Sequence, residues 1–201
     1  MAKGVTQARL LETGERIFLE KGYNHTGIQA VLKDAGVPKG SFYHYFKSKE
    51  DFGLKVVEAS NNAYLAKLEQ FFGDETRSPL ARLRHYFESG VQTLAGNDFR
   101  CGCLVGNLSQ EMASQNDAFR QRLDEILLGW RDRFAQCLEE AQESGELCGS
   151  WDVKMLASFC IDSWEGAILR AKVTKSTEPL ETFVKVLFNT VLAAKAPETE
   201  C

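Results

Sequence analysis

Apolar residues recur every three or four positions along most of this chain, which is the spacing of one buried face of an α-helix. Near the start of the chain the pattern predicts three helices, over 5–21, 27–35 and 38–45. Gly22 ends the first helix, Thr26 is a suitable cap for the second, and Gly36 ends the second. Pro38 can open the third helix. The first N–H groups of a helix have no hydrogen-bond partner within it, so the N–H that proline lacks is not missed there.

The remainder of the chain has the same helical pattern. Ser48, followed three residues later by Asp51, can cap a fourth helix that runs to about Phe72. Five more amphipathic stretches, separated by Gly, Pro, Asn and Ser, are expected at 78–95, 104–113, 118–143, 152–175 and 178–195. The sequence therefore predicts an all-α fold.

Composition narrows the class of protein. A chain of 201 residues with 44% apolar residues can bury a substantial core. We find neither an apolar run of the roughly 18 residues that a membrane span requires nor the apolar stretch of a signal peptide, so we expect a cytoplasmic protein. In that compartment the six cysteines are expected to be free thiols.

Charge is unevenly distributed along the chain. Residues 1–49 carry eight Lys or Arg against four Asp or Glu, a net charge of +4. Because the whole chain carries −4, residues 50–201 carry −8. A basic segment joined to an acidic remainder suggests that the basic segment binds a polyanion, although a random scatter of surface charge is an alternative.

The second and third predicted helices have the lengths and the connecting turn of a helix-turn-helix, whose second helix enters the major groove of DNA. Hydrogen-bond donors are crowded in the third helix: Lys39, Ser41, Tyr43 and His44. Gly40 lets the backbone approach a phosphate. Three aromatic residues of the same helix are expected to anchor it to its neighbours: Phe42, Tyr45 and Phe46.

Three segments of this region resemble, in order and spacing, the DNA-binding domain of the TetR/AcrR family of bacterial transcriptional regulators. They are Gly22-Tyr23, Thr26-Gly27-Ile28 and the run from Ala35 to Glu50. The resemblance covers residues 6–66 and implies a homodimer that binds double-stranded operator DNA. It implies a helix-turn-helix domain at 1–49 and a ligand-binding and dimerisation domain at 50–201.

The resemblance also places the DNA contacts of the family on seven positions of this sequence: Thr26, Lys39, Gly40, Ser41, Tyr43, His44 and Lys49. Phe42 departs from the family pattern, which usually has Leu or Ile there. Its ring either reaches toward a base or fills the core, and we favour the core.

The last two helices offer more apolar surface than one chain would normally hide, and packing across a two-fold axis into a four-helix bundle would bury it. The family further implies an unknown small-molecule effector, bound among the helices of the ligand-binding and dimerisation domain. Candidates with aromatic or polar side chains are His85, Tyr86, Asn107, Trp130, Phe134, Phe159, Trp164 and Glu165.

Cys103 is a second kind of candidate for effector sensing. It follows Gly102 and should lie at the N-terminus of a helix, where backbone N–H groups stabilise a thiolate, and Arg100 is nearby. The alternative is that Cys103 and Cys101 are small buried hydrophobic residues, which we favour for Cys101. The segment also resembles a TetR subgroup in which some members respond to electrophiles or oxidants. No metal site is expected, because two cysteines without a nearby His or carboxylate do not complete a tetrahedral set.

An enzyme and a structural or ligand-binding dimer are the alternative classes of function. The chain contains no nucleophile elbow, phosphate-binding loop, zinc-protease motif or dinucleotide fingerprint, so neither an enzyme nor a cofactor is expected. A helical small-molecule-binding or structural dimer without sequence-specific DNA binding would leave the donor-rich third helix unexplained. The sequence therefore predicts a DNA-binding transcriptional regulator, a repressor released by a small-molecule, electrophile or oxidant effector.

Overall fold

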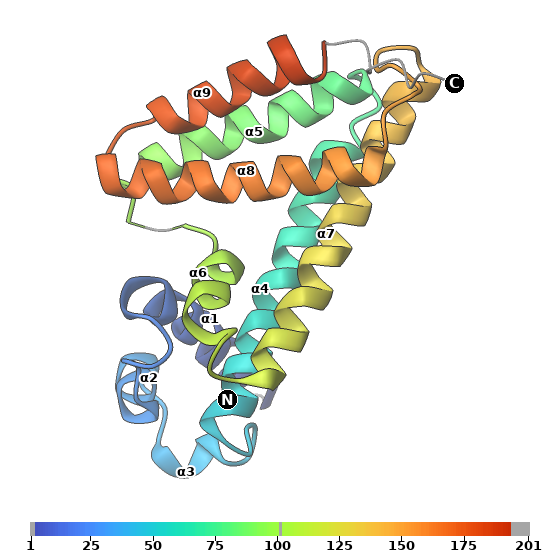
Figure 1. Ribbon diagram of the computed structural model, residues 1–201. Helices are drawn as coiled ribbons and strands as arrows, with labels where there is room; N and C mark the ends of the chain where they lie inside the picture. The colour runs from blue at the N-terminus through green and yellow to red at the C-terminus, as the bar shows by residue number, and fades with distance from the viewer. Residues whose placement is uncertain (1–2, 101, 194–201) are drawn as a thin grey trace. The chain divides into compact units, whose positions relative to one another are not determined.

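The computed structural model of the protein describes residues 3–100 and 102–193. These residues form α-helices and no β-strand, which confirms the all-α prediction (Figure 1). The helices are α1 (Lys3–Lys21), α2 (Ile28–Ala35), α3 (Lys39–Phe42), α4 (Lys49–Phe72), α5 (Pro79–Gly96), α6 (Leu104–Met112), α7 (Asp117–Glu143), α8 (Val153–Thr174) and α9 (Glu178–Val186). Among them, none is long and apolar enough to cross a membrane.

The starts of α4 and α8 lie where the sequence predicts them. At the start of α4, the Asp51 N–H donates to Ser48 Oγ at 3.0 Å, and the Lys47 N–H donates to Asp51 Oδ2 at 2.7 Å. The arrangement resembles a capping box, except that Asp51 accepts from the residue before the cap rather than from Ser48 itself. Asp152 caps α8 by accepting hydrogen bonds from the N–H groups of Lys154 and Met155.

Two predicted helix ends are wrong. The N-cap of α2 is Gly27 rather than Thr26, whose hydroxyl donates to the Gly22 carbonyl. The third helix ends at Phe42 rather than Tyr45, because Tyr45 N–H bonds to the carbonyl three residues back in a tight turn. The last helix ends at Val186 and continues as a π-helical turn over Leu187–Val191, and the expected end at 195 lies outside the described residues.

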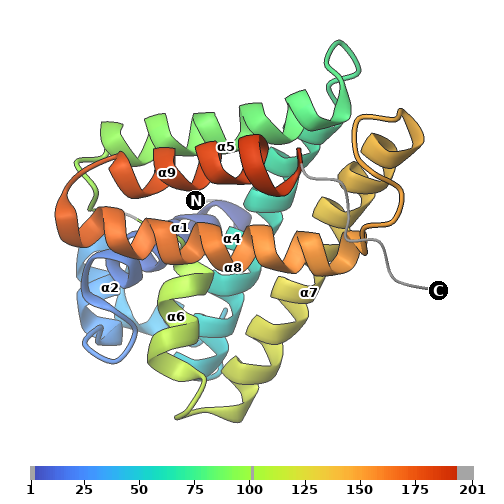
Figure 2. The same cartoon turned by 45° about the horizontal axis from the view of Figure 1, so that its top comes forward.

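The described residues form two compact units. The first contains 3–64 and 102–126, which are α1, α2, α3, α6 and the first parts of α4 and α7. Its core is aromatic: the Phe52 ring lies 5.4 Å from Phe42, 4.9 Å from Phe46 and 5.8 Å from Phe18, between ring centroids. The second contains 65–100 and 127–193, in which α9 packs against both α5 and α8 (Figures 1 and 2). The domain boundary expected after residue 49 stays a prediction.

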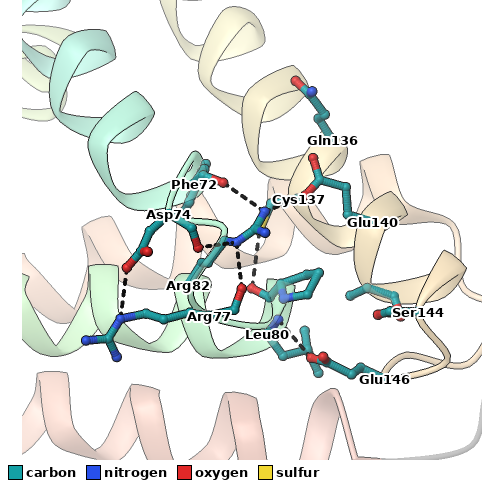
Figure 3. A network of polar contacts seen from close by, with 12 residues as sticks. Phe72, Asp74, Arg77, Leu80, Arg82, Gln136, Cys137, Glu140, Ser144 and Glu146 are labelled. Carbon is teal, nitrogen blue, oxygen red and sulfur yellow. Dashed lines mark hydrogen bonds and ion pairs between the residues drawn. The ribbon is translucent and has the colours of Figure 1, made fainter.

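Arg82 fixes the connection between α4 and α5 within the second unit (Figure 3). Its Nε donates to the carbonyls of Asp74 and Arg77, both at 2.9 Å. Its Nη1 donates to the Phe72 carbonyl at 3.0 Å and to Glu140 Oε2 of α7 at 2.7 Å. One guanidinium therefore binds carbonyls at the end of α4 and in the following loop. These carbonyls have no hydrogen-bond partner within a helix.

Candidate DNA-binding site and candidate effector residues

Helix α3 and the turn that follows it, residues 39–45, present most of their polar side chains to solvent. Lys39, Gly40 and His44 are exposed, and the side chain of Tyr43 is 57% exposed. Ser41 is half-buried. The aromatic core explains this orientation: Phe42 and Phe46 are fully buried against Phe52 of α4, so the residues between them must point outward. Phe42 is therefore a core residue, as we favoured.

The turn before α3 is fixed by a glycine and an arginine. Gly36 has a φ of +61°, the left-handed conformation that ends α2. Arg9 of α1 donates from Nη2 to the Gly36 carbonyl at 3.3 Å. Arg16 of α1 pairs with Asp34 of α2. These contacts hold α1, α2 and α3 in one arrangement, so the exposed face of α3 has a defined direction.

Two of the seven expected DNA contacts have their side chains directed inward. The hydroxyl of Thr26, which is 2% exposed, donates to the Gly22 carbonyl at 2.6 Å. Lys49 Nζ donates to the Tyr23 carbonyl at 2.7 Å and lies 4.2 Å from the centroid of the Tyr23 ring. Burial lowers the pKa of Lys49. In this structure both side chains stabilise the turn between α1 and α2.

Cys103 lies at the helix N-terminus where the sequence predicts it. It is the N-cap of α6, it is half-buried, and its Sγ accepts a hydrogen bond from the Gly106 N–H at 3.3 Å. Asn107 lies one turn further along, and its N–H donates to the Cys103 carbonyl. Cys101 lies outside the described residues. Among the residues that the structure describes, no disulfide involves Cys103, Cys137, Cys148 or Cys160.

The aromatic candidates for an effector pocket belong to the second unit, and most of them are buried in it. The Tyr86 ring lies 5.4 Å from Phe134, and the Trp164 ring lies 5.0 Å from Phe87. Trp130 is buried as well, whereas Phe159 is exposed on α8. The structure thus groups Tyr86 with Phe134, but it places Cys103 and Asn107 in the other unit.

One residue that the sequence analysis missed holds the turn before α2. Glu111 of α6 accepts hydrogen bonds from the backbone N–H groups of Tyr23 and Asn24. The partners are almost ninety residues apart in the chain, so no local pattern could reveal this contact.

Comparisons with known proteins agree with this architecture. Residues 10–54 match the domain described as bacterial regulatory proteins, tetR family. Residues 79–187, more than half of the chain, match the tetracyclin repressor-like, C-terminal domain. The chain belongs to the TetR family. It is accordingly a DNA-binding transcriptional regulator and not an enzyme, which confirms both predictions.

Several members of the TetR family are similar over nearly the whole chain. Transcriptional regulator AcuR of Cereibacter sphaeroides is 46% identical over 88% of this chain and 80% of its own length. HTH-type transcriptional repressor DhaR of Mycobacterium sp. is 38% identical over 100% of this chain and 97% of its own length. The crystal structure of Escherichia coli NemR in its reduced form superposes with a TM-score of 0.85 at 33% identity, covering 96% of this chain and 100% of that one.

Proposed function

We propose that this TetR-family regulator is a cytoplasmic repressor that binds operator DNA as a homodimer and releases it when an effector binds or modifies the protein. The observation that carries the proposal is the outward polar face of α3, built on a buried aromatic base. Such a short, rigid element with exposed donors is suited to the major groove. The relatives DhaR and NemR are both named transcriptional repressors, which supports repression rather than activation.

The proposed DNA contacts are those expected from the sequence, with a distinction that the structure adds. Lys39, Gly40, Tyr43 and His44 are exposed and available without rearrangement. Lys49 must exchange its bond to the Tyr23 carbonyl for a phosphate before it can contact DNA. For Thr26, we propose an indirect role in DNA binding: its bond to the Gly22 carbonyl keeps the turn between α1 and α2 in the conformation that positions α2 and α3.

Operator binding by matched variants tests the proposal. Fluorescence anisotropy would compare a duplex from the region upstream of the gene with a scrambled duplex over a range of salt. Lys39→Ala should weaken binding to every duplex and reduce the slope of log affinity against log salt by about one per subunit. Lys154→Ala is the control, because Lys154 is an exposed lysine of α8. Equal affinity of the wild-type protein for both duplexes would refute sequence-specific regulation.

For the effector, we propose that Cys103 is a site of electrophile modification. The half-exposed thiol accepts a backbone hydrogen bond at the N-terminus of α6, an environment that favours the thiolate. Burial raises the pKa of Cys137 and of Cys160 to about 12, so both are poor nucleophiles at neutral pH. Adding a group at Cys103 would alter the packing at the start of α6, because close-packed interiors shift rather than absorb added volume.

N-Ethylmaleimide followed by mass spectrometry and DNA binding tests this proposal. The wild-type protein and the Cys148→Ser variant, which lacks an exposed thiol, should both lose the operator after treatment, whereas Cys103→Ser should retain it. If Cys103→Ser loses the operator as completely as the wild type, Cys103 is a structural residue, and a reversible ligand is the effector.

A further inference from the structure

The turn between α1 and α2 is bound by a single carboxylate of α6. Glu111 Oε2 accepts the Tyr23 N–H at 2.9 Å, and Oε1 accepts the Asn24 N–H at 2.7 Å. Hydrogen bonds to an ionised carboxylate are about twice as strong as those between neutral groups. The two oxygens thus fix two consecutive peptide groups of the turn.

Gly22 permits this approach. Its φ is +79°, and a Cβ at this position would lie 2.9 Å from Glu111 Oε2. Any other residue would be strained in the left-handed conformation and would push the carboxylate away. The glycine that ends α1 therefore also admits Glu111.

The same peptide is held from its other side by α4. Lys49 Nζ donates to the Tyr23 carbonyl, and Glu111 accepts the Asn24 N–H of the same peptide group. The charge of Glu111 raises the pKa of Lys49 and so opposes the larger effect of burial. Tyr23 is thus clamped between a cation of α4 and an anion of α6.

Further contacts join the turn between α1 and α2, and the start of α4, to residues 115–119 at and before the start of α7. The Tyr23 ring packs on Phe119 at 4.9 Å between centroids. Asn24 Nδ2 donates to Gln115 Oε1, and Asn116 Nδ2 donates to Glu50 Oε2 at 2.6 Å. Lys49 bonds to one carbonyl of the turn, whereas Glu111 accepts two of its N–H groups, so Glu111 makes the larger number of bonds to this backbone.

We propose that Glu111 is a positioning residue for operator binding: it fixes the orientation of the helix-turn-helix relative to α6. The inference rests on the proposed function, namely that the two helix-turn-helix domains of a dimer, here called heads, bind the two half-sites of an operator. Simultaneous binding of two half-sites depends on the orientation of each head, whereas binding of one half-site depends only on the exposed face of α3. Loss of the Glu111 contacts should therefore weaken bivalent binding selectively.

The test compares variants on two duplexes, the full operator and a single half-site, at low salt. Glu111→Gln presents an NH₂ group to one of the two backbone N–H groups, and Glu111→Ala removes both acceptors. Both variants should bind the full operator about tenfold more weakly than the wild type and bind the half-site unchanged. Asp124→Asn, at an exposed carboxylate of α7 in the same unit, should change neither affinity.

Amide hydrogen exchange provides a readout that does not depend on DNA. In both Glu111 variants the Tyr23 and Asn24 amides should exchange faster, while the Phe46 amide, which bonds to the Phe42 carbonyl, should keep its protection. A merely structural role for Glu111 would instead lower affinity for both duplexes equally and expose Phe46 as well.

The outcomes separate the two proposals. An unchanged ratio of operator to half-site affinity in the Glu111 variants overturns the positioning role. If the wild type does not prefer its operator, the proposed function fails instead, and exchange alone decides the inference. Unchanged exchange at Tyr23 and Asn24 would then overturn it.

Discussion

Individual polar side chains stabilise this protein chiefly by bonding to backbone groups that helices leave unsatisfied. Glu111 binds two N–H groups, Arg82 binds three carbonyls, and Asp51 binds one N–H at the start of α4. Helix ends and turns expose such groups, and burying them unpaired costs about 1–3 kcal/mol each. Replacing these side chains should therefore affect stability more than replacing residues in surface ion pairs.

Asp51 should make stability depend on pH in the acid range. The hydrogen bond from Lys47 N–H holds the pKa of Asp51 below its ordinary 3.8. A lowered pKa in the folded state stabilises the protein above the ordinary pKa, and this contribution is lost as the pH falls through the folded value. Urea unfolding should show Asp51→Asn less stable than the wild type by about 0.5–1 kcal/mol at neutral pH, with the difference vanishing below pH 3.8. A difference that is constant across this range would contradict the assignment.

Arg82 should not be replaceable by lysine. Its side chain is 12% exposed and donates to four acceptors in different directions, which one ammonium cannot reach together. Arg82→Lys should destabilise the protein by about 1–3 kcal/mol in urea unfolding. Arg120→Lys is the control, because Arg120 forms an exposed pair with Asp117 and should change stability by less than about 0.5 kcal/mol. Equal effects of the two variants would show that the Arg82 contacts contribute little.

At the scale of the helices, the sequence predicted what depends on neighbouring residues. The start of α4 was predicted from Ser48, because a cap acts within one turn. The end of α3 was not, because the burial of both Phe42 and Phe46 decides where that helix stops. The same limit applies to the site: the exposed face of α3 was predictable, but the inward bond of Lys49 and the contacts of Glu111 join distant segments.

The packing of α5 on α8 depends on Gly90. A Cβ at Gly90 would lie 2.6 Å from Cζ2 of Trp164, so the two helices or the indole would have to move. Gly90→Ala should therefore lower the melting temperature, at a cost of about 1–3 kcal/mol. Gly129→Ala is the matched change: Gly129 is a helical glycine of α7 with open space around it, and alanine should stabilise that helix by about 0.5–1 kcal/mol. Differential scanning calorimetry should show a lower melting temperature for Gly90→Ala and a higher one for Gly129→Ala. A higher melting temperature for both variants would contradict the packing argument.

For the whole molecule, the distribution of apolar surface indicates how two copies associate. Most apolar residues of the last two helices are buried within the second unit, and of these Phe183 and Leu187 also line a groove on its surface. The outer faces of α8 and α9 nevertheless expose Met155, Phe159, Leu169, Val173 and Val186. A groove of about 490 Å³ between these helices is lined by Phe159 and Val186 among others. We propose this face as the site of a four-helix bundle with a second copy.

A carboxylate on this face should separate the copies without unfolding them. Val173 is 68% exposed, so Val173→Asp removes no intramolecular core contact, but in a dimer its charge would be buried at a cost of several kcal/mol. Sedimentation velocity should show monomers for Val173→Asp combined with Phe159→Asp, with unchanged helical circular dichroism. Leu128→Asp, at an exposed apolar position of α7, should leave the dimer intact. The monomer should bind the single half-site as the wild type does and lose its advantage on the full operator, because only one head remains. A stable dimer from the double variant would place the interface on another face.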